Sequence, residues 1–125
     1  MTRYVLDAGA LIALDRNDRW LWQLYRSARR DGVPLVTHGG VIAQVVRSAR
    51  QARLAQALGA VDVVAIDREL GRMTGYLLAT SRTRDVVDAA LVLISEPGDT
   101  ILTSDPDDLE VLVAAADKVV AIVEV

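Results

Sequence analysis

Short apolar runs alternate along this chain with longer stretches of helical periodicity, and this alternation constrains the fold more than any other feature. Strands separated by helices favour a parallel sheet, because the chain must cross back to the starting edge between successive strands. We therefore expect an α/β fold, a three-layer α/β/α sandwich with a mostly parallel central sheet. The expected strands are residues 3–6 (RYVL), 33–37 (VPLVT), 61–66 (VDVVAI), 99–103 (DTILT) and 119–125 (VVAIVEV).

The stretches between these runs predict helices. Asp67 occupies a capping position before a helix that should reach about residue 80, and Gly32 should end the helix that precedes the second strand. Residues 39–59 predict one helix or two in succession, and residues 96–99 predict a turn. A chain of 125 residues has room for one core, so we expect a single domain over residues 1–125. The other expected helices are residues 8–15, 18–32, 84–95 and 105–117.

Composition supports a parallel core and excludes several kinds of site. The chain is 52% hydrophobic but only 4% aromatic, and a core of Val, Leu, Ile and Ala suits a parallel sheet that is covered on both faces. The absence of cysteine excludes disulfides, thiolate nucleophiles and cysteine-based zinc sites, and it fits a reducing cytoplasm. The apolar run near the N-terminus is short and interrupted by an acid, so we expect a cytoplasmic protein with no membrane partner.

Charge limits how this chain could bind nucleic acid. The net charge of -3 and the pI of about 5.0 argue against binding through bulk positive charge, so any such role must be local. Of the 14 basic residues, Lys118 is the only lysine. Arginine matches phosphate oxygens two at a time, although a high-GC coding bias explains the same composition equally well.

Aspartates stand where a parallel sheet would place a ligand site. Asp7 ends the first expected strand and Asp105 the fourth, so both should lie at the carboxyl edge of the sheet. Asp88 falls within the apolar helix VVDAALVLI, where an unpaired carboxylate costs several kcal/mol, and Asp85 adds a like charge on the same helix face. Carboxylates gathered in an apolar setting favour a hard cation with oxygen ligands, Mg²⁺ or Mn²⁺ rather than zinc.

Each acid also has a purely structural interpretation. Residues 105–108 (DPDD) match a helix start, with a capping side chain, a proline at the first position and acids near the positive end of the helix dipole. Asp7 could in the same way cap the helix that follows it. Asp88 could be neutralised by Arg82 or Arg84. Capping and metal binding are compatible, since one carboxylate oxygen can serve each role.

Three segments resemble motifs of the PIN-domain ribonucleases, in the same order along the chain. The overall size is similar to that of the VapC-type toxins of bacterial type II toxin–antitoxin pairs. The resemblance covers nearly the whole chain. The segments are VLDAGALIALD at residues 5–15, VVDAALVLIS at residues 86–95 and ILTSDPDDL at residues 101–109.

The resemblance implies a metal-dependent endoribonuclease that hydrolyses RNA phosphodiester bonds. Asp7, Asp88 and Asp105 match the catalytic, metal-binding acids of that family, and Asp108 resembles a further acid that precedes an apolar residue. The implied cofactor is Mg²⁺ or Mn²⁺. The implied partners are an RNA substrate, a small cognate antitoxin that covers the active-site side near the first helices, and a second copy of the chain in a homodimer.

One position departs from the family pattern. A glutamate usually follows the second strand, in a stretch like VIAQVVR, and this chain has Gln44 there. Glutamine keeps an oxygen ligand but loses a negative charge that faces the cation. Three interpretations are open: a weaker but working site, a site completed by another acid such as Asp85, or a catalytically weak or inactive module that binds RNA or protein.

Arg47 and Arg50 are the candidate substrate-binding residues. They follow Gln44 at three-residue steps, so on one helix they would present guanidinium groups to backbone phosphates, although a solvated helix face explains them as well. His38 is the only histidine and has no partner for a metal site, so we expect it to be structural. Trp20 and Trp22 are expected in the core or in a subunit contact.

A response-regulator receiver domain is the alternative at the level of the fold. Such a domain needs a pair of acids at the first strand, a phosphorylatable aspartate at the third and a lysine at the last. Asp67 fits the second requirement, but Asp7 stands alone and Lys118 precedes its strand. The sequence therefore favours the nuclease interpretation.

Overall fold

The computed structural model describes residues 2–125, in which five strands form one fully parallel sheet. The strands are β1 (Tyr4–Leu6), β2 (Leu35–His38), β3 (Asp62–Val64), β4 (Thr100–Thr103) and β5 (Ala121–Glu124). Their spatial order is β3-β2-β1-β4-β5. From β1 the chain adds β2 and β3 on one side of the sheet and then β4 and β5 on the other. The direction of winding therefore reverses between β1 and β4, and the carboxyl ends of these two strands flank this switch point. Ligands of open parallel sheets bind at such a point.

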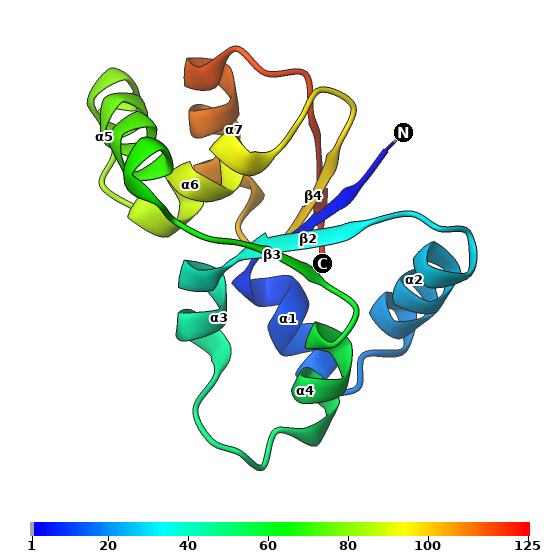
Figure 1. The fold of residues 1–125 in the computed structure, drawn as a ribbon. Helices are drawn as coiled ribbons and strands as arrows, with labels where there is room; N and C mark the ends of the chain where they lie inside the picture. Colours follow the sequence, from blue (N-terminus) through cyan, green and yellow to red (C-terminus); the bar gives the residue numbers. More distant parts are fainter. Residues whose placement is uncertain (1) are drawn as a thin grey trace.

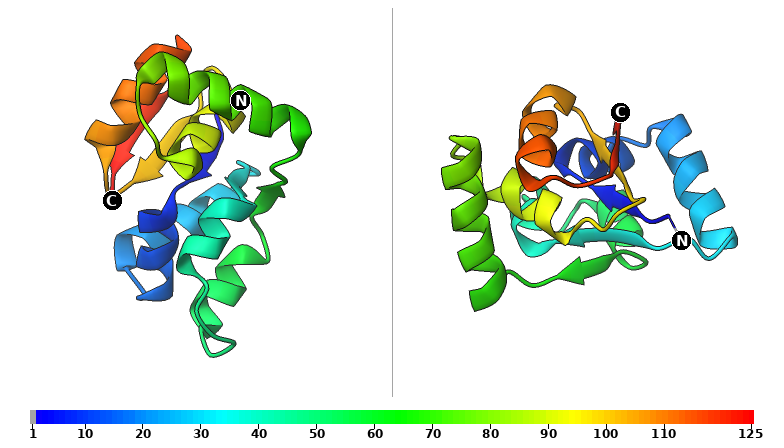
Figure 2. Two further views of the ribbon diagram at one scale, coloured as in Figure 1. Left: turned by 90° about the vertical axis from the view of Figure 1, so that its left-hand side faces the viewer. Right: turned by 90° about the horizontal axis from the view of Figure 1, so that it is seen from above.

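Helices cover both faces of the sheet (Figure 1), and the two further views show the same layering (Figure 2). One layer contains α1 (Ala8–Asp15), α2 (Arg19–Arg30), α3 (Gly39–Val45) and α4 (Ala52–Leu58). The other contains α5 (Arg68–Ser81), α6 (Val86–Ile94) and α7 (Pro106–Ala116). The expected three-layer α/β/α sandwich with a parallel sheet is confirmed. Within residues 2–125, no helix combines the length and the apolar character that a membrane span needs.

Aliphatic side chains fill the two interfaces between the sheet and the helices. Leu11 of α1, Leu91 of α6, Leu102 of β4 and Leu109 of α7 are fully buried in one continuous core. Apart from Trp22 and Tyr25, the buried core within residues 2–125 consists of Leu, Val, Ile and Ala, as the composition predicts. The core fixes the carboxyl end of β1 against that of β4.

The helix starts follow from capping side chains. Asp18 accepts a hydrogen bond from the backbone N–H of Leu21 at 2.8 Å, and Asp67 accepts one from Leu70 at 2.9 Å. Each bond satisfies an N–H that has no partner within its helix. The predicted cap at Asp67 is therefore confirmed, and α2 ends at Arg30, two residues before Gly32.

The stretch 39–59 forms two helices in succession, which was one of the two expected arrangements. The side-chain oxygen of Gln51 accepts the backbone N–H groups of Arg47, at 2.7 Å, and Ser48, at 3.1 Å. Its side-chain nitrogen donates to the carbonyl of Val45, the last residue of α3. The placement of Arg47 and Arg50 on the same helix as Gln44 is therefore wrong, because the chain leaves the helix at Val46.

Charged side chains at the amino edge of the sheet are paired. Arg3 contacts the buried carboxylate of Asp99 at 2.6 Å and also donates to the carbonyl of Ile94 at 3.0 Å. Burial alone would raise the pKa of Asp99, but the hydrogen bond from Arg3 and a backbone N–H from Glu96 hold it below its usual value. Lys118 donates to the carbonyls of Val92, Leu93 and Ser95 at the end of α6.

Gly9 lies where the first turn of α1 passes the end of β4. A Cβ atom at this position would come within 2.9 Å of the backbone nitrogen of Ser104 and would also meet its side chain. Only glycine permits this approach of α1 to the end of β4.

We predict that Gly9→Ala lowers the free energy of unfolding by about 1–3 kcal/mol, because the added methyl group overlaps a backbone atom that cannot rotate away. Gly75→Ala is the matched control, since Gly75 lies within α5 and a Cβ there would meet nothing within 4 Å. That substitution should stabilise the protein by about 0.5–1 kcal/mol. Urea unfolding of the two variants measures both effects, and an equal response would show that α1 does not approach β4 this closely.

Candidate metal centre

The aspartates singled out in the sequence gather at the carboxyl edge of the sheet. Asp7 directly follows β1, Asp105 and Asp108 lie where β4 passes into α7, and Asp88 lies in the first turn of α6. Burial raises the pKa of Asp88, and together with the nearby charges of Asp7, Asp85, Asp108 and Asp105 it brings the value to about 7. Segments far apart in the sequence therefore act on one carboxyl group.

Asp7 is held rigidly at the centre of this edge. Its side chain is buried, Oδ1 accepts the backbone N–H of Ala8 at 2.7 Å, and Oδ2 accepts the hydroxyl of Thr103 at 2.8 Å. Asp7 thus caps α1, as its structural interpretation holds. Each carboxylate oxygen keeps a further lone pair, so capping does not exclude a second role.

Thr103 links Asp7 to Asp105. Its hydroxyl donates to Asp7 and accepts the backbone N–H of Asp105 at 3.0 Å. The residue is fully buried at the end of β4, next to β1 in the sheet. No sequence pattern indicates this role of Thr103, because it depends on which strands are neighbours in the sheet.

Asp105 holds the N-cap position of α7 without capping it. Its side chain makes no hydrogen bond to the helix and is exposed. Pro106 at the first helical position and the acids Asp107 and Asp108 in the first turn do follow the expected helix-start pattern. The carboxylate of Asp105 is consequently free for another function.

Asp88 and Asp108 line one pocket between α6 and α7, with a volume of about 230 Å³. Asp85, the N-cap of α6, also lines it and accepts the backbone N–H of Asp88 at 2.9 Å. Asp108 in addition lines a neighbouring hollow of about 290 Å³ together with Asp105. Asp108 is therefore the residue through which the two hollows adjoin.

No arginine neutralises these acids in the described part of the chain. Arg84 lines the pocket with Asp88, but neither it nor Arg82 forms a salt bridge to that carboxylate within residues 2–125. The neutralisation considered for Asp88 is therefore absent there. We call the carboxyl edge with Asp7, Asp88, Asp105 and Asp108 the acidic edge. It differs in this respect from the amino edge, where Arg3 pairs with Asp99.

His38 has the structural role expected of it. It is fully buried, its Nε2 lies 2.9 Å from the carbonyl of Val87 in α6, and its Nδ1 accepts the backbone N–H of Gly40 at 3.0 Å. These partners assign the proton to Nε2 of a neutral ring. Burial lowers the pKa of His38, which favours the same neutral form. The bond to α6 holds the first turn of that helix, and hence Asp88, against the end of β2.

The remaining candidates, Gln44, Arg47 and Arg50, lie on α3 and in the connection that follows it. Gln44 is exposed on α3, which begins directly after β2. Arg47 donates to the carbonyls of Ala43 and Val46, which closes the end of α3. Arg50 lies in the connection between α3 and α4.

The carboxylates of the acidic edge are suitable ligands for a hard divalent cation, but in this structure they lie too far apart to bind one ion together. All candidate ligands are carboxylates, as Mg²⁺ and Mn²⁺ prefer. Within residues 2–125, however, no three acidic or histidine side chains already stand close enough to hold one ion. The carboxylates interact electrostatically at their present separations, and Asp105 and Asp108 have exposed side chains that are able to rotate.

Comparisons with known proteins add no family assignment. The sequence matches no profile of a protein family, and no curated protein matches it either. The likeness to PIN-domain ribonucleases accordingly rests on the three sequence motifs alone.

We predict that Asp88 makes the stability of the metal-free protein pH-dependent. Its folded pKa of about 7 exceeds its ordinary value of 3.8, so the folded state retains a proton that the unfolded state loses. The free energy of unfolding should therefore fall as pH rises from about 4 to about 7 and level off above that. Asp88→Asn should remove this loss and stabilise the protein at pH 8 by on the order of 1–3 kcal/mol, allowing for partial solvent screening.

Urea unfolding in EDTA at several pH values measures this slope. Asp117→Asn is the control, since Asp117 is an exposed acid in a left-handed conformation that asparagine tolerates. An unchanged slope in Asp88→Asn would show that this carboxyl group is not held in its proton-bound form.

Proposed function

We propose that this protein is a divalent-metal-dependent endoribonuclease and that the acidic edge is its active site. One observation carries the proposal: Asp7, Asp88, Asp105 and Asp108 lie at the carboxyl edge of a parallel sheet, near the point where the direction of winding reverses, and burial together with these like charges raises the pKa of Asp88 to about 7. An uncompensated group of carboxylates destabilises a fold, so its presence is best explained by a cation that relieves the repulsion.

Asp7, Asp88 and Asp105 would hold the Mg²⁺ or Mn²⁺, with Asp108 as a further ligand. The metal would supply a water activated for attack and would neutralise charge on the scissile phosphate. Asp7 is oriented for this purpose by Ala8 and Thr103, and Thr103 couples its position to that of Asp105. His38 takes no part in proton transfer in this proposal, because both of its ring nitrogens already have partners.

RNA as the substrate, and a toxin role in a toxin–antitoxin pair, rest on the motif resemblance. The same resemblance suggests a small antitoxin, a homodimer and a cytoplasmic location. Ile12 of α1 and Trp20 of α2 are exposed large apolar side chains on the first two helices, at 37% and 49% of their surface. They support the proposal that a partner covers this side of the molecule.

A catalytically weak or inactive binding module is the second candidate. Gln44 favours it, because the glutamine removes a charge where the family has a glutamate. The open arrangement of the carboxylates in residues 2–125 favours it as well. The two candidates differ in whether RNA is cleaved.

We predict Mn²⁺- or Mg²⁺-dependent cleavage of structured RNA by the purified protein, abolished by EDTA. Asp7→Asn should lower the rate by roughly two orders of magnitude, since it removes a charge that binds the metal while it retains an oxygen for the bond from Ala8 and places an amide N–H against the Thr103 hydroxyl oxygen. Asp117→Asn should cleave like the wild type. Gel analysis of end-labelled RNA measures the rates, and equal rates in Asp7→Asn and the wild type would attribute the cleavage to a contaminant.

We predict that Gln44→Glu raises the affinity for Mn²⁺ about tenfold, because a carboxylate binds a hard cation more strongly than an amide oxygen does. Gln23→Glu provides the same change of charge on the exposed surface of α2 and should leave the affinity unchanged. Calorimetric titration compares the three proteins. Equal affinities for Gln44→Glu and the wild type would show that Gln44 does not occupy a ligand position.

A further inference from the structure

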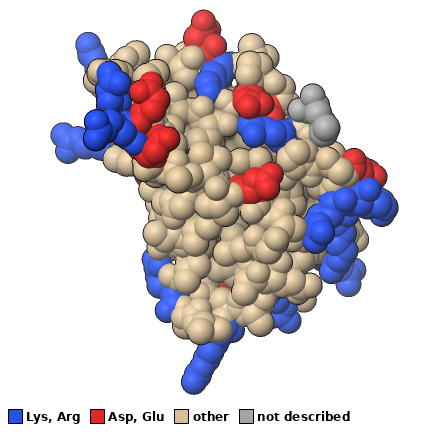
Figure 3. Space-filling model, in the orientation of Figure 1, with Lys and Arg blue, Asp and Glu red and all other residues tan. Residues whose placement is uncertain are grey.

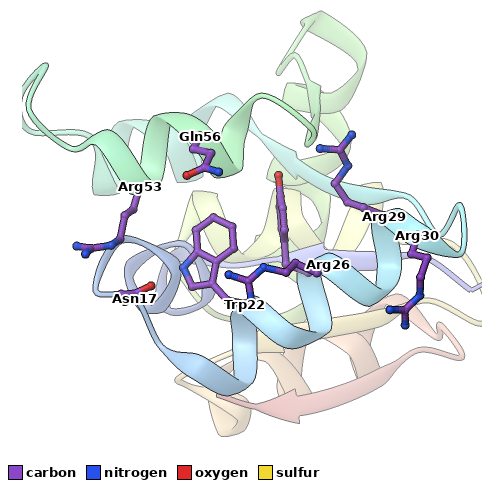
Figure 4. A pocket seen from close by; sticks show the side chains of 8 residues that line it. Asn17, Trp22, Arg26, Arg29, Arg30, Arg53 and Gln56 are labelled. Carbon is purple, nitrogen blue, oxygen red and sulfur yellow. The ribbon is translucent and has the colours of Figure 1, made fainter.

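A second concave site lies between α2 and α4, in the helical layer that contains α1. Its volume is about 460 Å³, in the range of sites that bind ligands. Trp22 of α2 lies at its centre (Figure 4), and Tyr25 of the same helix and four arginines also line it. These arginines are Arg26, Arg29, Arg30 and Arg53.

The arginines of this pocket are not balanced by acids. No carboxylate lines the pocket, and no salt bridge within residues 2–125 involves Arg26, Arg29 or Arg53. Arg30 approaches its neighbour Asp31 at 3.7 Å, but both side chains are well exposed, so this contact contributes little. In a chain with 17 acidic and 14 basic residues, four of the latter converge here. The space-filling view shows basic side chains gathered over α2 (Figure 3).

Trp22 and Tyr25 form the bottom of the pocket, and their rings are too buried to stack with nucleic-acid bases. Trp22 and Tyr25 are only 5% and 6% exposed. Trp22 donates to the carbonyl of Leu14 at 2.9 Å and Tyr25 to that of Ala57 at 2.8 Å, so the polar atoms of both rings are engaged. The guanidinium of Arg26 lies 5.5 Å from the centre of the Trp22 ring, which orders it before any ligand arrives.

The positions of the arginines indicate the shape of the ligand. Figure 4 shows Arg53 on one side of the Trp22 ring and Arg29 and Arg30 on the other, with Arg26 beside the ring. Charges placed around a rim in this way do not converge on one small anion. They fit a ligand with several negative groups in a row, and guanidinium groups bind phosphate in pairs of hydrogen bonds.

We propose that this pocket binds the phosphodiester backbone of single-stranded RNA and anchors the strand away from the acidic edge. Its link to cleavage rests on the proposed function, whereas the binding itself requires no metal and no acid. The absence of exposed rings and the dominance of arginine predict binding with little sequence preference, through phosphates.

The experiment measures binding of a fluorescently labelled 12-residue oligouridylate to the Asp7→Asn protein in EDTA, where no cleavage interferes. Arg29→Gln/Arg53→Gln removes one guanidinium from each side of the pocket. The matched control is Arg68→Gln/Arg72→Gln, which removes two arginines from α5 in the opposite layer. We expect the pocket variant to bind about tenfold more weakly and to lower the slope of log Kd against log salt by roughly 1.4, while the control changes Kd less than twofold.

Arg29→Lys/Arg53→Lys keeps the charge and tests the paired hydrogen bonds, and it should bind at an intermediate strength. Circular dichroism checks that each variant folds. If a variant does not fold, a second measurement takes its place: the fluorescence of Trp22 is recorded in a Trp20→Phe protein during titration with RNA. RNA that enters the pocket should change this fluorescence.

Equal weakening by the pocket variant and the α5 control, or an unchanged Trp22 signal, would overturn the proposal in favour of bulk charge. Binding of polyglutamate as tight as that of RNA would overturn it in favour of an acidic protein partner. Unchanged RNA affinity in the pocket variant, with cleavage intact, would refute the anchor and leave the nuclease proposal standing. Arginine-dependent binding without any cleavage would support the anchor and refute the nuclease.

Discussion

The pairing of β1 with β4 determines the rest of the acidic edge. The backbone N–H of Asp7 donates to the carbonyl of Leu102 at 3.0 Å, and the hydroxyl of Thr103 donates to the side chain of Asp7. These bonds lie between buried residues, where an unmatched partner costs about 1–3 kcal/mol, so the two strand ends cannot shift relative to each other without loss. Because Asp105 is bonded to Thr103, its position follows from the same contact.

Within residues 2–125, charged side chains are paired at the amino edge of the sheet and unpaired at its carboxyl edge. At the amino edge, Arg3 pairs with Asp99, and Lys118 binds the carbonyls at the end of α6. At the carboxyl edge, burial and the surrounding like charges raise the pKa of Asp88 to about 7. The fold is therefore able to neutralise buried charge and does not do so at the switch point. That asymmetry is typical of a functional site, where stability is given up for binding.

The sequence predicted the elements well because hydrophobic spacing and capping are local. The strands, the cap at Asp67 and the placement of Asp7 and Asp105 at one edge follow from such patterns. It left open whether residues 39–59 form one helix or two, because the break after Val45 depends on the Gln51 side chain accepting two backbone N–H groups. Nor could it identify Thr103 or the tie between His38 and α6, since these contacts join residues far apart along the chain. The sequence could not predict the arginine pocket for the same reason, because its lining residues come from both α2 and α4.

Electron paramagnetic resonance of Mn²⁺ tests the central claim most directly, because bound and free ions give different signals. Titration of the wild-type protein with Mn²⁺ at pH 7.5 should show saturable loss of the free-ion signal, and Asp105→Asn should reduce the uptake sharply. A free-ion signal that rises in proportion to added Mn²⁺ from the first addition, or an Asp105→Asn protein that takes up as much as the wild type, would contradict a metal site at the acidic edge.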